Sequence, residues 1–202
     1  MSDKNNSTKD TTKDGIKWKK YAEIYDPIRI GSIDGTDTDP HDNGIVRAIN
    51  SHYKPNERVV GNPKHTIFIG RLHLRTDEKT IRRKFQRYGN IVNLRLVRDA
   101  VTGISKQYAF IEYDSSASVK DAIYDMDQRV IDEREIIVDV EHERQLKGWK
   151  PRRLGGGFGG KKESGQLRFG CKARPFQRPY DSNKPMTSSQ MKEIFRHQKC
   201  RK

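Results

Sequence analysis

The strongest constraint on the fold of this chain is the order of its hydrophobic periods between residues 65 and 140. Alternating apolar residues typical of strands are interrupted twice by the three- and four-residue spacing of an amphipathic helix. The expected elements are strands at 66–70, 91–98, 108–113 and 135–140, and helices around residues 78–88 and 119–126. This βαββαβ order predicts an α+β, ferredoxin-like domain, in which a four-stranded antiparallel sheet has both helices on one face and its other face open to a ligand.

Composition limits how much of the chain can pack around a core. Of 202 residues, only 32% are hydrophobic and 34% are charged. Polar segments do not bury enough apolar surface to offset their ordering entropy, so we expect one packed domain of roughly 80 to 100 residues. Its N- and C-terminal flanks are expected to be largely extended or disordered.

Composition also divides the chain into segments. These are a disordered N-terminus at 1–20, an extension at 21–63, the packed domain at 64–143, a Gly/Arg-rich basic arm at 144–180 and a polar basic tail at 181–202. The extension is expected to contain a short helix near 40–53. Asp39 and Pro40 are typical of a helix start, and Ile45, Ile49 and Tyr53 would form its one apolar side.

Several classes of protein are excluded. No apolar run approaches the roughly 20 residues of a membrane span, and the polar start lacks the apolar region of a signal peptide, so we expect an intracellular protein without a membrane partner. Cys171 and Cys200 have no neighbouring ligands at metal-site spacing and are interpreted as free thiols. The six histidines are scattered, and no catalytic constellation is present. We therefore predict no enzyme activity, metal, cofactor or small-molecule substrate.

The positive charge lies at one end of the chain. Residues 144–202 contain 17 Lys and Arg against 3 Asp and Glu, whereas residues 1–143 contain 24 of each, so the tail carries the whole net charge of +14. A basic tail behind a neutral body indicates a polyanionic partner, with nucleic acid as the first candidate and an anionic membrane surface as the second. A tail that only increases solubility is the simpler alternative.

Two short motifs indicate what the open sheet face does. Residues 106–113, Lys-Gln-Tyr-Ala-Phe-Ile-Glu-Tyr, fit the octamer of the RNA recognition motif (RRM). Residues 67–72, Ile-Phe-Ile-Gly-Arg-Leu, fit its hexamer on the first strand. Both motifs fall on strands that the periodicity predicts independently, so the fold and the motifs agree.

The alternation of these strands predicts an aromatic platform. Tyr108 and Phe110 share one face with Phe68 of the neighbouring strand, while Ala109 and Ile111 face the core. Bases that stack on such rings gain about 1–3 kcal/mol each. The alternative, in which the rings form the core, would expose Ala109 and Ile111 and leave both helices without a partner.

Polar residues around the platform are expected to support RNA binding. They are Arg71, Arg95, Arg98, Lys106 and Gln107. Arg95 and Arg98 lie on the second strand and its end, beside the rings. Gln107 replaces the usual Gly of the octamer and Arg71 the usual Asn of the hexamer, so we expect a less compact start of the third strand and an extra charge after the first.

The basic arm begins directly after the last strand. Gly155, Gly157 and Gly160 match a dinucleotide-binding fingerprint, but no buried strand precedes them and no helix follows, so we exclude a nucleotide site. The simpler interpretation of the arm is a flexible linker. The sharper one is an arm that follows an RNA backbone through Lys147, Trp149, Lys150, Arg152, Arg153, Lys161 and Lys162.

The RRM and this arm together resemble a family of spliceosomal small nuclear ribonucleoprotein (snRNP) proteins that includes the 70-kilodalton protein of the U-one particle. Tyr25-Asp26-Pro27 and residues 31–42 before the domain, with 165–170 behind it, resemble the family's 35-kilodalton branch in the minor spliceosome. The resemblance covers about residues 21–179. It implies a nuclear, structural RNA-binding subunit that binds the first stem-loop of U-eleven snRNA, acts with other minor-spliceosome snRNP proteins and supports recognition of minor-intron 5′ splice sites.

Two alternatives to an snRNP subunit stay open at this point. A free splicing regulator that binds pre-mRNA would have the same platform, although the flanking segments oppose it. An RRM diverted to protein binding usually lacks platform aromatics, and here all three are present. The identity of the RNA that co-purifies with the protein distinguishes these hypotheses.

Overall fold

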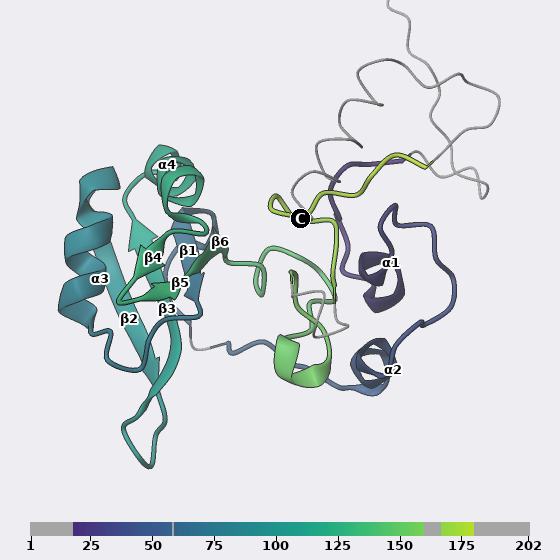
Figure 1. The fold of residues 1–202 in the computed structure, drawn as a ribbon, viewed down its shortest axis with the longest axis horizontal. Coiled ribbons are helices and arrows are strands. Elements are labelled where there is room, and N and C mark those ends of the chain that lie inside the picture. Colours follow the sequence, from purple (N-terminus) through teal and green to yellow (C-terminus); the bar gives the residue numbers. More distant parts are fainter. Residues whose placement is uncertain (1–17, 58, 160–166, 180–202) are drawn as a thin grey trace, which may run out of the picture.

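The structure, a computed structural model, describes residues 18–57, 59–159 and 167–179. The chain forms two neighbouring parts, an RRM and a smaller unit built from both of its flanks (Figure 1). Residues 1–17, Lys161 and Lys162 of the predicted arm, and the predicted tail at 181–202 lie outside the described residues.

The RRM has the predicted βαββαβ order. Its main elements are β1 (Thr66–Gly70), α3 (Glu78–Phe85), β2 (Ile91–Arg98), β3 (Ser105–Tyr113), α4 (Ser116–Met126) and β6 (Ile137–Val140). The strands form an antiparallel sheet in the order β2-β3-β1-β6. A short 3-10 turn, η1 (Pro63–His65), precedes β1, and another, η2 (Gln86–Tyr88), follows α3.

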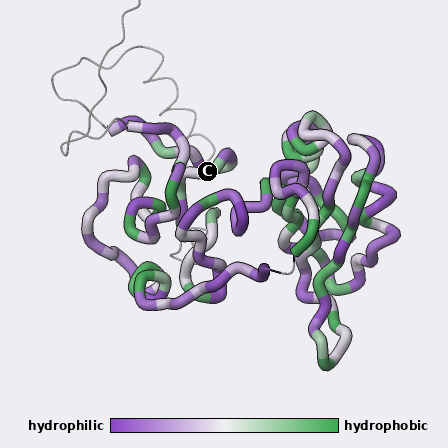
Figure 2. Tube along the Cα trace, turned by 180° about the vertical axis from the view of Figure 1, so that it is seen from behind, coloured by the Kyte–Doolittle hydropathy of each residue, from purple (hydrophilic) through white to green (hydrophobic). Residues whose placement is uncertain are grey.

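The RRM core lies between the sheet and the two helices. Ile81 and Phe85 of α3 and Ala122 of α4 are fully buried against Ile67 and Ile111 of the central strands. Figure 2 shows hydrophobic stretches alternating with hydrophilic ones along this part of the chain. Because both helices cover one face, the other face of β1 and β3 remains for a ligand, as predicted.

The last strand differs from the prediction. A two-residue hairpin, β4 (Val130–Ile131) with β5 (Arg134–Glu135), precedes β6, so the strand predicted at 135–140 begins only at Ile137. Asp132 and Glu133 form the turn with φ angles of 47° and 67°. Sequence alternation continues through such a turn, so it did not reveal the break.

The two flanks fold together into one unit, which we call the flank module (residues 18–53, 142–159 and 167–179). Its helical elements are α1 (Pro27–Gly31), α2 (Asn43–Asn50) and a 3-10 turn, η3 (Arg152–Leu154). Backbone hydrogen bonds join the flanks directly, including Tyr25 N to Lys147 O at 2.9 Å and Gln177 N to Ile33 O at 2.9 Å. The RRM is therefore inserted between the two halves of this module.

The flank module has a small aromatic core of its own. Tyr25, Ile30, Leu146 and Phe176 are buried, and Trp18, Ala22, Trp149, Phe158 and Phe169 pack against them. Rings from the arm and from the extension pack against each other, which explains how so polar a segment orders. The predicted disorder is therefore wrong for residues 18–20, since Trp18 packs against this core and Lys20 O accepts a hydrogen bond from Phe176 N.

The predicted helix near 40–53 is shorter and begins later. Asp42, and not Asp39, caps α2, because its carboxylate accepts a hydrogen bond from Ile45 N at 2.7 Å. The helix ends before Tyr53, and Ile49 is 45% exposed. The Asp-Pro helix start does occur, but at Asp26, where it begins α1.

Glycines of the arm let the two flanks approach closely. Gly155 has a φ of +89°, and a Cβ there would lie far inside contact distance of the Gly44 carbonyl oxygen at the start of α2. Arg168 crosses the same junction: its side chain is 1% exposed and pairs with Asp42 at 3.0 Å. Gly155 of the glycine run therefore serves a close contact within the protein.

Candidate nucleic-acid interface

The three predicted rings form one cluster on the open face of the sheet. Phe68 lies opposite Phe110 in the β1–β3 register, and their ring centroids are 5.6 Å apart. Tyr108 lies 6.0 Å from each of them. All three side chains are half-buried, whereas Ala109 and Ile111 are fully buried on the opposite face. The predicted facing of these residues is confirmed.

Only one of the two predicted β2 arginines accompanies the rings. Arg95 pairs in register with Phe110, so the two side chains share a face, and Arg95 is exposed. Arg98 instead pairs in register with buried Ser105 and makes an ion pair with Glu78 of α3 at 3.0 Å. The placement of Arg98 beside the platform is therefore wrong, because a shift of register near the end of β2 puts it on the helix side.

The two departures from the RRM consensus have a backbone explanation. Arg71 and Gln107 both have positive φ angles, 61° and 63°, a region that Gly and Asn adopt more easily than other residues. Gln107 O accepts a hydrogen bond from Leu72 N at 2.9 Å, and Gln107 N donates to Ser105 Oγ at 3.0 Å. The expected loosening at the start of β3 is therefore wrong, and the position is strained but closed.

The loop between β2 and β3 is held in one shape and projects away from the RRM (Figure 1). The Asp99 carboxylate accepts hydrogen bonds from Thr102 N at 3.0 Å and Val101 N at 3.1 Å, and these bonds lower the pKa of Asp99. Lys106 lies 3.5 Å from the same carboxylate. Val101 in this loop is 93% exposed, so the loop presents an apolar side chain to solvent.

The protein's own chain bounds the platform on two sides. At one end, Glu112 accepts a hydrogen bond from Asn62 N at 2.7 Å. On β6, Asp139 lies opposite Phe68 but is buried and pairs with His142 at 3.0 Å, and His142 stacks on Trp149 at 5.3 Å. A ligand therefore has most room toward β2 and its loop.

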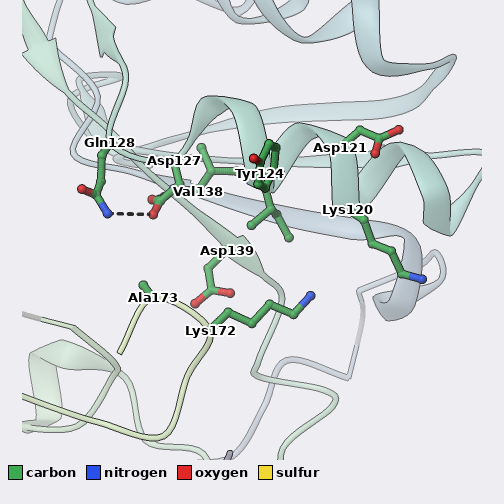
Figure 3. A pocket seen from close by; sticks show the side chains of 10 residues that line it. Lys120, Asp121, Tyr124, Asp127, Gln128, Val138, Asp139, Lys172 and Ala173 are labelled. Carbon is green, nitrogen blue, oxygen red and sulfur yellow. Dashed lines mark hydrogen bonds between the residues drawn. The ribbon is translucent and has the colours of Figure 1, made fainter. Parts of the chain in front are cut away.

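A groove of about 710 Å³ runs along the outer edge of β6, between α4 and Lys172 (Figure 3). The outer edge of β6 does not pair easily with another strand. The Asp127 carboxylate accepts a hydrogen bond from the outward Val138 N–H at 2.9 Å, and the Asp139 carboxylate accepts one from Val140 N–H at 2.8 Å. Both backbone donors are already paired within the protein.

The arm is part of the flank module, so its interpretation as a flexible linker is wrong for the described residues. Trp149 contacts Tyr25 edge-on at a centroid distance of 4.8 Å, which makes it a packing residue and not a free stacking ring. Lys150 donates to Ser51 O, and Arg153 lies over the Tyr53 ring at 5.7 Å. Lys147 is exposed, while its backbone pairs with the extension.

Two residues of this region had no signal in the sequence. Asp42 and Arg168 are 126 positions apart, and no spacing rule pairs them.

Cys171, predicted to be a free thiol, is free and buried, and burial raises its pKa to about 11. The described residues contain no helix that could cross a membrane and no group of three potential metal-ligating side chains.

Comparison with known proteins agrees with this architecture. The family model of the RNA recognition motif matches residues 67–137. A zebrafish (Danio rerio) protein, the U11/U12 small nuclear ribonucleoprotein 35 kDa protein, is 54% identical over 164 residues, which cover 81% of this chain and 79% of that protein. This chain belongs to the U11/U12 snRNP 35 kDa protein family. The alignment is far longer than the RRM, so the family likeness includes the flanks.

Other relatives place the family among snRNP proteins. The human (Homo sapiens) U11/U12 35 kDa protein is 58% identical over 162 residues, 80% of this chain and 66% of that protein. The U1 snRNP 70 kDa protein of Arabidopsis thaliana is 37% identical over 143 residues, 70% of this chain and 34% of that protein. As a member of the U11/U12 snRNP 35 kDa family, the chain is an RNA-binding snRNP protein of pre-mRNA splicing and not an enzyme.

Proposed function

We propose that this chain binds the first stem-loop of U11 snRNA through the open face of its RRM. The observation that carries the proposal is the platform, in which Phe68, Tyr108 and Phe110 stand half-buried on the sheet face that the helices leave open. RRMs read unpaired bases by stacking them on such rings. The name of the relatives, U11/U12 snRNP proteins, supports the RNA of that particle as the ligand.

The surroundings of the platform favour a hairpin over a linear RNA. The platform alone reads two or three bases, too few to select one RNA among many. The pre-shaped β2–β3 loop carries exposed Val101, and Lys106 pairs with Asp99 of the same loop, so the loop can enter an RNA loop while the bases lie on the rings. Basic residues of the arm then follow the stem phosphates. Together they recognise a short unpaired sequence at a fixed distance from a duplex.

The wider role follows from the family. We propose a structural subunit of the minor-spliceosome snRNP in the nucleus, which acts with other proteins of the particle and supports recognition of minor-intron 5′ splice sites. Phosphate contacts by the arm contribute affinity without selecting sequence. The predicted arm contacts by Lys147, Arg152 and Arg153 belong to this proposal.

The test compares one RNA in two forms. The U11 hairpin is expected to bind markedly more tightly than a linear oligonucleotide with the same loop bases, because only the hairpin offers loop and stem together. In parallel, RNA that co-purifies with the protein from cells is sequenced. Recovery of one snRNA in stoichiometric yield is expected.

The same experiment evaluates the alternative function. Equal affinity for hairpin and linear RNA, together with a broad profile of messenger fragments, would contradict the snRNP proposal and favour a free splicing regulator. The absence of co-purifying RNA would favour an RRM diverted to protein binding. The RNA that co-purifies with the protein therefore distinguishes the three hypotheses.

A further inference from the structure

Two polar side chains on the platform face lie outside the predicted set of RNA-binding residues. Glu112 follows Phe110 by two residues on β3, so strand alternation places both side chains on the same face. On β2, Asn93 pairs in register with Glu112, as Arg95 does with Phe110. The Cβ atoms of directly opposed residues lie about 5 Å apart. A carboxylate and an amide therefore lie side by side, one step along the strands from a platform ring.

The linker that enters the RRM holds the Glu112 carboxylate in place. Its Oε1 accepts a hydrogen bond from Asn62 N at 2.7 Å. Gly61 packs against the same carboxylate: its φ is +103°, and a Cβ at Gly61 would overlap the Glu112 side chain. Within the described part of the chain, Oε2 of Glu112 has no hydrogen-bond partner. The carboxylate is therefore fixed and half-buried, and it keeps acceptor capacity for a ligand.

The negative charge of Glu112 restricts what binds beside it. Arg144 donates to Gly61 O at 2.8 Å, but its ion pair is with Glu141. A carboxylate repels RNA phosphates and attracts N–H donors. Asn93 is exposed, and its side chain makes no hydrogen bond with any residue that the structure describes. The pair of Glu112 and Asn93 therefore suits the edge of a base and not the RNA backbone.

From this geometry we propose that Glu112 and Asn93 form a guanine site, which recognises the Watson–Crick edge of one base of the RNA loop. The inference rests on the proposed function. Guanine carries two neighbouring donors, N1–H and the N2 amino group, beside the acceptor O6. The Glu112 carboxylate accepts hydrogen bonds from both donors, and the Asn93 amide donates one to O6.

The other three bases fit this pair less well. Adenine and cytosine each place a ring nitrogen acceptor at the centre of that edge, where it would face the carboxylate, and uracil has one N–H between two carbonyl oxygens. The distance also suits a stacked purine. Two residues along a strand span roughly 6.6 Å, about the reach of a purine edge with one hydrogen bond, so a guanine stacked on Phe110 meets Glu112. The platform ring and the polar pair thus act on the same base.

The test selects RNA loops with matched proteins. A library of hairpins keeps the U11 stem and carries a randomised loop, and the bound RNA is sequenced for the native protein, Glu112→Gln and Asn93→Ala. Glu112→Gln keeps an oxygen for Asn62 N, so the linker contact survives while the charge and one acceptor are lost. Asp121→Asn, which neutralises an exposed carboxylate on α4, is the control. Thermal unfolding shows whether each variant is folded.

A guanine site predicts a specific pattern. The native protein and the control should enrich guanine at one loop position. Inosine at that position, which lacks only the N2 amino group of guanine, should weaken native binding roughly tenfold, the effect of one hydrogen bond to a charged group. In Glu112→Gln the preference for guanine should disappear, and inosine should bind as well as guanine. Asn93→Ala should enrich guanine less strongly but keep the inosine effect.

Other results would overturn the inference. A native protein that enriches no guanine would remove the site, as would an inosine effect of the same size in Glu112→Gln. A uniform loss of affinity for all loops in Glu112→Gln would indicate that this carboxylate only anchors the linker. If Glu112→Gln does not fold, Asn93→Ala decides, because an unchanged preference for guanine in that variant contradicts the site.

Failure of the proposed function is recognised separately. If Phe110→Ala leaves binding of the U11 hairpin unchanged, the platform itself does not bind the RNA. A sensitive platform whose base preference is the same in the native protein and in Glu112→Gln contradicts only the guanine site.

Discussion

Replacement of Asp42 by Asn isolates the charge that joins the two flanks. The side chain of Asp42 does two things: it caps α2 through Ile45 N at 2.7 Å and pairs with Arg168 at 3.0 and 3.3 Å. Asn caps a helix about as well as Asp does, so Asp42→Asn keeps the cap and removes the charge. Any loss of stability then reports on the ion pair.

The size of the effect follows from burial. Arg168 is 1% exposed, so the substitution leaves a buried guanidinium without a counter-charge. Breaking a fully buried pair costs about 3–5 kcal/mol. Asp42 is 19% exposed, and water there reduces the penalty, so we expect a loss of about 2–3 kcal/mol in the free energy of unfolding of the flank module. Asp42→Ala should cost about 1 kcal/mol more, because it also removes the cap.

The two parts of the protein can be observed separately. The chain has two tryptophans, Trp18 and Trp149, and both pack in the flank module. Tryptophan fluorescence during denaturant unfolding therefore follows this module, while methyl resonances of Ala109 and Ile111 follow the RRM core. The fluorescence transition is expected to move to lower denaturant and the RRM transition to stay in place.

The matched control is Asp26→Asn. Asp26 caps α1 through Ile28 N at 2.9 Å, and an amide keeps that bond. It should change the free energy of unfolding measured by fluorescence by only a few tenths of a kcal/mol. The reasoning is refuted if Asp42→Asn leaves the fluorescence transition within the range of this control, or if it destabilises the RRM equally.

Two further predictions concern RNA binding and acid stability. Phe110→Ala and Tyr108→Ala should each weaken hairpin binding by about 1–3 kcal/mol with the fold intact. Tyr124→Ala, which removes a 93% exposed ring from α4, should leave the affinity unchanged. Isothermal titration calorimetry measures these affinities, and equal losses in all three variants would contradict the platform. Burial alone would raise the pKa of Asp42, but hydrogen bonds from Arg168 and Ile45 outweigh it and lower that pKa. The stability that the ionised Asp42 carboxylate contributes is therefore fully present above its unfolded pKa of about 3.9 and is lost as pH falls through the lower folded pKa. An acid titration followed by tryptophan fluorescence should show that the stability of the flank module declines less steeply in Asp42→Asn. Identical profiles in the two proteins would contradict this linkage.

The sequence by itself determined the RRM and the facing of its platform. Both follow from local periodicity: a strand alternates every two residues, so Tyr108 and Phe110 had to share one face once Ala109 and Ile111 were assigned to the core. The consensus departures at Arg71 and Gln107 were visible, but their cost was not, because φ angles of 61° and 63° are properties of the folded turn.

Only the tertiary structure decided what the flanks do. Low hydrophobicity predicted disorder, yet a few rings far apart in sequence, such as Tyr25, Trp149 and Phe176, form a core because the inserted RRM brings its two flanks together. The same long-range closure pairs Asp42 with Arg168. Local sequence patterns report which face a side chain occupies, whereas contacts between the two flanks depend on where the whole chain returns.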